Sequence, residues 1–290
     1  MQLFNSSTEF VIHTAPFNFL IRSNSTKFYQ QVKALYPSQL LTQNDHNQVI
    51  DFVVDFKRSW WSVSQAFAFR LGSQHFRYCH QEQMCSVLEW GMNWCLSSYQ
   101  HRYLCIHAAV LEKDNKAIIL PAPPGSGKST LCAILMQEGW RLLSDEHCLI
   151  DPVSGQLVPC VRPISLKNRS LAVIQQRYPT AQINVIQQNT LKGTIGYLAP
   201  SEYSWQQNLQ KTEPAVIVFP KYDSDTATTL LEPIEQSTLL MHLAVNSFNY
   251  SALGKQGFDV LSHLVSRCPG YSLIYADTDD MLLKIKALLV

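Results

Sequence analysis

A glycine-rich segment between an apolar strand and an apolar helix is the feature that most constrains this chain. The segment APPGSGKS runs from Ala122 to Ser129; Ala117 to Leu120 before it is apolar, and Thr130 to Gln137 after it has helical periodicity. Small residues let successive backbone N–H groups turn toward one anion, and the N-terminal end of the next helix attracts the same anion. The sequence therefore predicts a phosphate-binding loop, or P-loop, in an α/β domain.

The residue types in this loop favour a nucleotide as the ligand. Lys128 is placed to reach the outer phosphates, and Ser129 offers a hydroxyl to Mg²⁺. The motif G-x-x-x-x-G-K-[ST] is met except that Ala122 replaces its first glycine, which a β-region backbone would tolerate. A chance match in a surface loop is the alternative, but the strand and the helix on either side favour nucleotide binding. The predicted contacts are Pro124, Gly125, Ser126, Gly127, Lys128, Ser129 and Thr130.

Two adjacent acids follow at the distance at which the chain returns to the sheet. Asp145 and Glu146 lie 17 and 18 residues beyond Lys128, inside a strand predicted from Leu142 to Leu149. A carboxylate there can hold Mg²⁺ or accept a proton from an attacking hydroxyl. Neighbouring residues of a strand point to opposite faces, so one acid can be purely structural. Asp145 is predicted as the base, and Ser129, Glu146 and Asp145 as candidate metal ligands.

The segment from Ile106 to Glu146 resembles the C-terminal catalytic domain of HPr kinase/phosphorylase, whose P-loop is related to that of phosphoenolpyruvate carboxykinase. Ile106–Val110 is similar to the family's His-Gly-Val stretch, and Gly139–Glu146 to its Gly-His-Arg-Leu-Val-Ala-Asp-Asp. The resemblance implies a P-loop kinase domain of the HPr kinase/PEP carboxykinase type over residues 101–290. Residues 1–100 form an N-terminal α+β region in this reading.

Four further segments look like the stand-alone HPr-kinase-related kinases, which are associated with peptide-modification systems that include a PqqD-like peptide-binding partner. They are Leu88–Trp94, Arg162–Asn168, Lys192–Thr194 and Ser247–Tyr250. The resemblance implies a kinase that uses ATP and Mg²⁺ and phosphorylates a serine of a peptide or small protein, with such a partner.

Carried over by position, the resemblance assigns roles to individual residues. Asp145 matches the catalytic base, His107 the active-site histidine, and Lys128 and Ser129 the phosphate and metal contacts. Glu146 replaces the second aspartate of the family.

One position departs from the pattern. The family's metal-binding glutamate precedes the arginine matched by Arg162, yet Cys160 and Val161 stand there. Metal is then expected to rest on Ser129, the acidic pair and the nucleotide itself, because Mg²⁺ keeps waters and substrate phosphates as ligands.

Basic residues concentrate in the middle of a chain whose net charge is +1: residues 101–200 carry 10 basic and 6 acidic side chains. Arg162, Lys167 and Lys192 are predicted to contact phosphates, with a solvated basic face as the alternative. Lys192–Thr194 suits either a mobile loop that closes over nucleotide or an ordinary turn. Asn246–Tyr250 suits either contact with a peptide or the support of a helix end.

The first hundred residues read as strands followed by a helix. Apolar runs predict strands at Phe10–Ile12, Phe17–Ile21, Val49–Phe56 and Ala66–Leu71. Apolar residues at three- and four-residue spacing predict a helix with one buried face over Gln81–Tyr99, with Trp90 and Trp94 in the core.

Composition excludes several classes of protein. With 46% hydrophobic and 16% charged residues the chain is not disordered, and its near-neutral charge argues against partners such as nucleic acid or acidic membranes. The sparse charge favours some apolar surface that faces another subunit or a partner. Family members of the HPr type assemble as hexamers, so the resemblance implies that this chain can form a homo-oligomer. No run approaches the ~18 apolar residues of a spanning helix.

The eight cysteines include no C-x-x-C pair and predict buried free thiols. The N-terminus lacks an export signal, so a cytoplasmic location is expected. His80 beside Cys79 and Cys85 is too isolated to predict a zinc site.

These observations lead to one expectation and two alternatives. The expectation is an ATP-dependent serine kinase acting on a peptide or small protein. The alternatives are a kinase of a small hydroxylated metabolite and a catalytically weak, nucleotide-dependent module that binds a peptide or protein.

Overall fold

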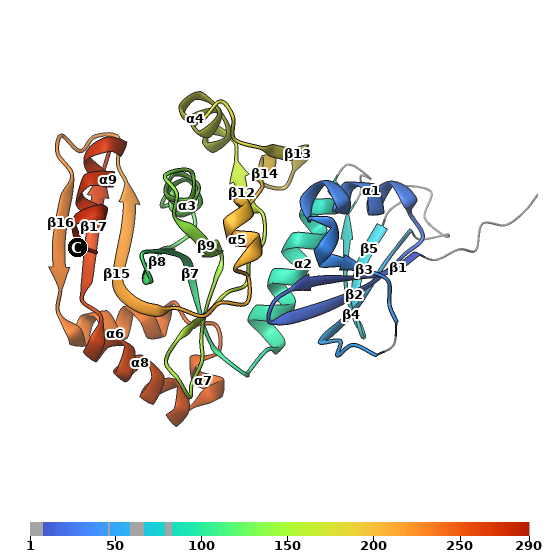
Figure 1. Ribbon diagram of the computed structural model, residues 1–290, viewed down its shortest axis with the longest axis horizontal. Helices are drawn as coiled ribbons and strands as arrows, with labels where there is room; N and C mark the ends of the chain where they lie inside the picture. Colours follow the sequence, from blue (N-terminus) through green and yellow to red (C-terminus); the bar gives the residue numbers. More distant parts are fainter. Residues whose placement is uncertain (1–7, 46, 59–66, 79–82, 290) are drawn as a thin grey trace, which may run out of the picture. The chain divides into compact units, whose positions relative to one another are not determined.

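The protein has a mixed α/β fold with several sheets. A computed structural model describes residues 8–45, 47–58, 67–78 and 83–289 (Figure 1). The chain divides into two compact units: unit 1 comprises Met1–Cys95 and Ser165–Ala199, and unit 2 comprises Leu96–Ile164 and Pro200–Val290. The domain boundary predicted after residue 100 stays a prediction.

Unit 1 contains a six-stranded sheet in the order β3-β1-β2-β4-β5-β6. Its pairs are antiparallel except β2 with β4. The strands are β1 (Thr8–Thr14), β2 (Phe17–Ser23), β3 (Leu41–Thr42), β4 (Phe52–Arg58), β5 (Phe67–Leu71) and β6 (Gln74–Tyr78). The four predicted strands are confirmed, although β4 begins three residues later than expected and Ala66 lies outside the described residues.

The helices of this part are α1 (Thr26–Leu35), the short 3₁₀ helix η1 (Ser38–Leu40) and α2 (Met84–Tyr99). The predicted helix is confirmed as α2, and its buried face contains Met84, Leu88, Met92 and Cys95. The core placement of Trp90 is wrong: its side chain is 46% exposed, because it stands two residues from both Leu88 and Met92 and so points away from their face. Trp94 is half-buried.

A second, three-stranded sheet has the order β12-β14-β13. It is built from β12 (Ile164–Lys167), β13 (Ile183–Thr190) and β14 (Gly193–Leu198), with α4 (Arg169–Arg177) following β12. Gly193 has a φ of 82°, and the Asn168 side chain accepts from the Thr194 N–H at 3.0 Å and donates to the Lys192 carbonyl at 3.1 Å. Lys192–Thr194 is therefore the turn of a hairpin, and Asn168 holds it.

Unit 2 is built on an eight-stranded mixed sheet in the order β11-β10-β7-β8-β15-β17-β16, with β9 also paired to β7. The strands β8, β15 and β17 are parallel to one another, and the remaining pairs are antiparallel. The bounds are β7 (Leu104–Lys113), β8 (Lys116–Pro121), β9 (Arg141–Ser144), β10 (His147–Ile150), β11 (Leu157–Val158), β15 (Glu213–Tyr222), β16 (Leu230–Ile234) and β17 (Gly270–Tyr275).

The helices of unit 2 include α6 and α8, which pack together (Figure 1). Leu239 and Leu243 of α6 and Leu261 of α8 are fully buried with the apolar residues of β7 and β8 in one core. The helices are α3 (Lys128–Gln137), α5 (Glu202–Gln206), α6 (Gln236–Val245), α7 (Tyr250–Leu253), α8 (Lys255–Arg267) and α9 (Thr278–Ala287).

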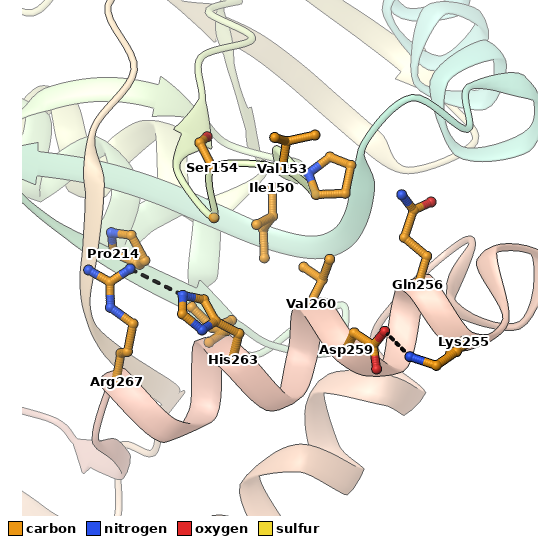
Figure 2. A pocket seen from close by; sticks show the side chains of 13 residues that line it. Ile150, Val153, Ser154, Pro214, Lys255, Gln256, Asp259, Val260, His263 and Arg267 are labelled. Atoms are coloured by element: carbon orange, nitrogen blue, oxygen red, sulfur yellow. Dashed lines mark hydrogen bonds and ion pairs between the residues drawn. The ribbon is translucent and has the colours of Figure 1, made fainter.

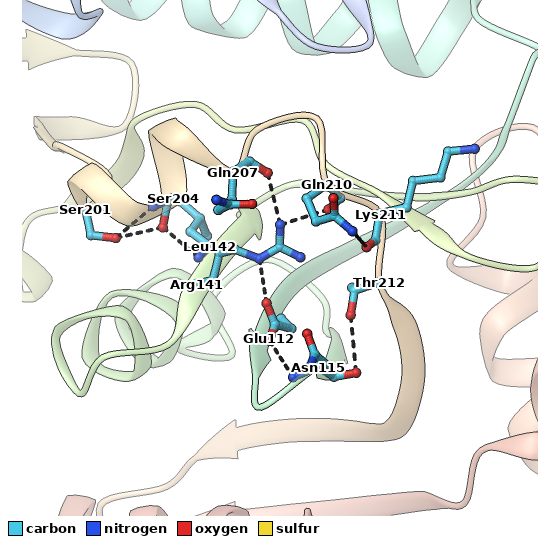
Figure 3. Close-up of polar contacts among 10 residues, drawn as sticks. All are labelled: Glu112, Asn115, Arg141, Leu142, Ser201, Ser204, Gln207, Gln210, Lys211 and Thr212. Carbon is cyan, nitrogen blue, oxygen red and sulfur yellow. Dashed lines mark hydrogen bonds and ion pairs between the residues drawn. The ribbon is translucent and has the colours of Figure 1, made fainter.

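A buried ion pair joins β7 to β9 (Figure 3). The Arg141 Nε lies 2.5 Å from a Glu112 carboxylate oxygen, and both residues are 5% exposed or less. The Arg141 Nη1 also donates to the carbonyls of Gln207 at 3.0 Å and Gln210 at 2.8 Å. One guanidinium thus fixes the loop after α5 to the sheet.

The thiol prediction is confirmed for the seven cysteines that the structure describes, all free and buried. Cys79 and His80 lie outside the described residues. No helix in the described part of the chain has the length and the apolar character needed to span a bilayer.

Candidate functional site

The predicted P-loop connects β8 to α3, as the sequence indicated. Gly125 and Gly127 have φ values of 89° and 91°, which L-residues rarely adopt, and a Cβ at Gly127 would lie 3.2 Å from the Tyr222 Cβ. Ala122 is not among the residues with positive φ, and it is buried. The backbone therefore favours glycine at positions 125 and 127, whereas it does not require the motif's first glycine at position 122.

The loop is fixed to the sheet at the carboxyl ends of its parallel strands. The Tyr222 N–H, at the end of β15, donates to the Ser126 carbonyl at 3.0 Å, and the Ser126 N–H donates to the Pro123 carbonyl at 3.3 Å. Ligands of α/β sheets bind in the crevice beyond this edge. The N-terminal end of α3, which begins at Lys128, opens onto the same edge.

Lys128 carries a buried ammonium group. Its side chain is 7% exposed, and its Nζ has no hydrogen-bond partner among the described residues. The nearest opposite charge is the Glu146 Oε2, at 3.7 Å. A buried ammonium is unfavourable unless anions surround it, so the position is complementary to a negatively charged ligand.

The strand predicted over Leu142–Leu149 is interrupted. β9 ends at Ser144, β10 begins at His147, and Asp145 and Glu146 form a bend between them. The Ser144 Oγ accepts from the N–H groups of His147 at 2.9 Å and Glu146 at 3.3 Å. The expectation that the two acids alternate across a strand is therefore wrong, because the Ser144 hydroxyl holds their backbone in a turn.

Glu146 links the P-loop lysine to the predicted histidine. Its Oε1 lies 3.4 Å from the His107 Nε2, and its Oε2 faces Lys128. Burial acts to raise the pKa of the Glu146 carboxyl, but the contact with His107 and the charge of Lys128 outweigh it and hold the pKa well below its usual range. Glu146 is therefore a carboxylate at physiological pH.

Asp145 is half-buried and lies beside α3. The Cys132 thiol, one helical turn beyond Lys128, donates a hydrogen bond to the Asp145 carboxylate. Burial and the charge of Asp145 raise the pKa of Cys132 well above its usual range, so the thiol keeps its proton. Asp145 is thus tied to the helix that follows the P-loop.

A second histidine is paired with the first on the neighbouring strand. His147 of β10 pairs with His107 of β7, and its Nδ1 lies 3.5 Å from the Arg162 Nη2. Burial and the Arg162 charge lower the pKa of His147 to about 3, so this ring is neutral at physiological pH. We call His107, Lys128, Glu146, His147 and Arg162 the P-loop cluster.

An aromatic ring borders the P-loop cluster. The Phe248 ring centroid lies 5.6 Å from that of His107 and 5.6 Å from that of His147, and the residue is 43% exposed. The surrounding segment runs along the edge of β7, where the His107 N–H donates to the Asn246 carbonyl at 2.7 Å.

The structure brings part of the predicted site together. The P-loop residues, His107, Asp145, Glu146 and Arg162 all belong to unit 2, whereas Lys167 and Lys192 belong to unit 1. Lys167 ends β12 and Lys192 lies in the β13–β14 turn, and both are exposed.

Sequence reasoning missed His147 and Ser144. His147 belongs to the site because its strand pairs with that of His107, and this pairing cannot be recognised from the sequence. Ser144 could have been recognised, because a serine just before the acidic pair can accept hydrogen bonds from the following N–H groups and form a turn. Among the residues described, no group of three or more His, Cys, Asp or Glu side chains is placed to hold a metal ion.

A separate pocket of about 610 Å³ lies between the β10–β11 turn and α8 (Figure 2). Its floor includes Ile150 and Val260, and its rim includes His263 and Arg267, whose side chains are 3.3 Å apart. None of the predicted site residues lines it.

One family model overlaps the P-loop segment. Residues 80–196 match the family model described as SynChlorMet cassette protein ScmC, which is less than half of the chain. No curated protein matches the chain. Among solved structures, the Hpr(Ser) kinase/phosphatase from Coxiella burnetii is similar at 14% identity and a TM-score of 0.30, over 64% of this chain and 93% of that one.

Proposed function

We propose that this protein is a kinase that uses ATP and Mg²⁺ to phosphorylate a serine hydroxyl in a peptide or small protein. The observation that carries the proposal is the buried Lys128 ammonium at the N-terminal end of α3, with the Glu146 carboxylate 3.7 Å away and two positive-φ glycines before it. This is the arrangement that a nucleotide's phosphates complete.

The residues fit both ligands. The P-loop N–H groups and Lys128 would hold the outer phosphates, and Arg162 adds a second buried cation. Ser129, Asp145 and Glu146 supply the oxygen ligands that Mg²⁺ prefers. They are fewer than the six ligands of an octahedral shell, which nucleotide phosphates and waters would complete. Bound Mg²⁺ would neutralise charge on the transferring phosphoryl group.

Asp145 is the proposed base. Its carboxylate accepts the serine proton while the serine oxygen bonds to the γ-phosphorus, and the bond from that phosphorus to the bridging oxygen breaks, releasing ADP. Lys128 and Arg162 stabilise the charge that develops. His107 contacts Glu146 and orients the Glu146 carboxylate toward the phosphates. His147 is neutral and adds no charge.

Transfer of labelled γ-phosphate tests the proposal. The wild-type protein with Mg²⁺ and ATP is expected to label serine in a peptide library, Lys128→Ala to lose binding and transfer together, and Asp145→Asn to bind ATP while losing most of its transfer. Label on small hydroxyl compounds alone would favour a metabolite kinase. Tight ATP binding by the wild type without any transfer would favour a nucleotide-dependent binding module and contradict the kinase.

The assembly follows as a further part of this proposal. We infer a PqqD-like peptide-binding partner, self-association and a cytoplasmic location. Light scattering of the purified chain, alone and with candidate peptide-binding proteins, tests the first two, and a monomer at high concentration would contradict self-association.

A further inference from the structure

Phe248 is a half-exposed aromatic ring held rigidly beside charged and polar groups. Its N–H donates to the Cys105 carbonyl at 2.8 Å, and the next residue, Asn249, is buried. The Asn249 side chain accepts from the Cys105 N–H at 2.9 Å and donates to the Tyr103 carbonyl at 2.9 Å. Hydrogen bonds of Phe248 and Asn249 therefore hold the backbone that carries the ring.

The ring lies on the side of Lys128 that Glu146 and His107 occupy. Lys128, the predicted contact of the outer phosphates, faces the Glu146 carboxylate. Glu146 in turn contacts His107. The Phe248 ring is tilted against the rings of both His107 and His147, and the residue is 43% exposed. The proposed base, Asp145, directly precedes Glu146, so an acceptor that gives its proton to Asp145 would approach on this side.

We propose that Phe248 is a specificity-determining residue that contacts an apolar side chain next to the acceptor serine. The inference rests on the proposed kinase function. The ring lies beside the His107 of the P-loop cluster, with 5.6 Å between the two centroids, and an extended peptide advances only about 3.3 Å per residue, so we expect the contact within two positions of the serine. Rigid, partly exposed aromatic rings are effective anchors for apolar partners.

The local charges favour an apolar side chain over a basic one. A cation could also bind the ring face. However, the P-loop cluster already holds the positive charges of Lys128 and Arg162 against the single carboxylate of Glu146, and Arg162 contacts His147 beside the ring. This net positive charge disfavours a further cation, whereas an apolar side chain would cover the exposed carbon surface of the ring.

Peptide selectivity tests this inference with the full chain. The probes are synthetic peptides with one central serine, in which leucine, glycine or lysine occupies each position from two before to two after the serine. The wild type is expected to prefer leucine over glycine by about tenfold in kcat/KM at one of these positions, the scale of discrimination that an apolar contact gives. Phe248→Ala is expected to reduce this ratio to less than about twofold, and Phe248→Leu to keep most of it.

The matched control is Phe258→Ala on α8, because Phe258 is 48% exposed and so resembles Phe248 in exposure. It is expected to keep the leucine preference. A tenfold preference that survives in Phe248→Ala, or a preference for lysine at that position, would overturn the inference while the kinase stands. Failure of the wild type to label any peptide would instead overturn the proposed function and the inference with it.

Discussion

Lys128 and Gly127 show how single residues constrain the candidate site. The lysine side chain is almost fully buried at the first position of α3, and the glycine before it has a φ of 91°. Both features are unfavourable for an isolated chain, since one buries a charge and the other requires a left-handed backbone. Their coincidence at a helix N-terminus is what an anion site requires.

Replacing the two loop glycines separates backbone strain from crowding. Gly125→Ala and Gly127→Ala each place a Cβ at a positive φ, which costs about 1–2 kcal/mol. Only Gly127 has a close neighbour there, the Tyr222 Cβ at 3.2 Å, whereas nothing lies within 4 Å at Gly125. We expect Gly127→Ala to lower the free energy of unfolding more than Gly125→Ala in urea titrations. Equal losses would contradict the crowding at Tyr222.

Residue-level signals in the sequence predicted the parts of the site that are contiguous in the chain. The P-loop residues, Asp145 and Glu146 follow from spacing and residue type alone. His147 does not, because only the pairing of β10 with β7 brings it opposite His107. The turn at Asp145 was not predicted either, because apolar residues on both sides favour one continuous strand. The Ser144 side chain interrupts this strand by accepting from the His147 N–H.

Two polar links fix elements of unit 2 to one another. Arg141 and Glu112 join β9 to β7 and hold the loop after α5 (Figure 3). Lys211, just before β15, contacts Asp151 at the end of β10, with 2.6 Å between Nζ and Oδ2. The first link is buried and the second is partly exposed, so their energetic contributions differ.

Removing one partner of the buried Arg141–Glu112 pair should destabilise the protein more than removing both partners. Arg141→Met leaves the Glu112 carboxylate buried without its partner and is expected to lower the free energy of unfolding by about 3–5 kcal/mol. Arg141→Met combined with Glu112→Leu removes both charges and should recover part of that loss, although the Gln207 and Gln210 carbonyls still lose their donor. Chemical denaturation of the three proteins measures the coupling, and losses that simply add would contradict it.

Asp151 makes stability depend on acid pH. The hydrogen bond from Lys211 lowers the pKa of the Asp151 carboxyl below its usual value of 3.8. Its folded-state pKa lies below its unfolded-state pKa, so the stabilisation is present above about pH 4 and is lost as the pH falls through the folded value. Asp151→Asn is expected to lower the free energy of unfolding by about 1 kcal/mol at pH 7.

The difference between wild type and Asp151→Asn should narrow as the pH falls below about 4, because the wild-type carboxyl then becomes neutral too. Thermal unfolding at several pH values measures it. A difference that stays constant from pH 7 to pH 3 would show that the asparagine acts through something other than lost charge.

At the scale of the whole chain, the two units are discontinuous in sequence. The chain leaves unit 2 after Ile164, residues 165–199 contribute the β12-β14-β13 sheet to unit 1, and the chain then returns to unit 2 at Pro200. Neither composition nor periodicity marks these crossings. Lys167 and Lys192 were predicted with the P-loop residues because of their basic character and the resemblance, yet they belong to the other unit.

Nucleotide binding should therefore stabilise unit 2 in the first place. At a concentration 100-fold above the dissociation constant, a ligand adds about 2.7 kcal/mol to the free energy of unfolding, which for a unit of this size raises Tm by about 5–10 °C. Mg²⁺ with ATP is expected to produce this shift in wild type and little of it in Lys128→Ala, which lacks the buried ammonium. Hydrogen exchange should place the gain in peptides from 96–164 and 200–289, and equal shifts in both proteins would contradict a P-loop site.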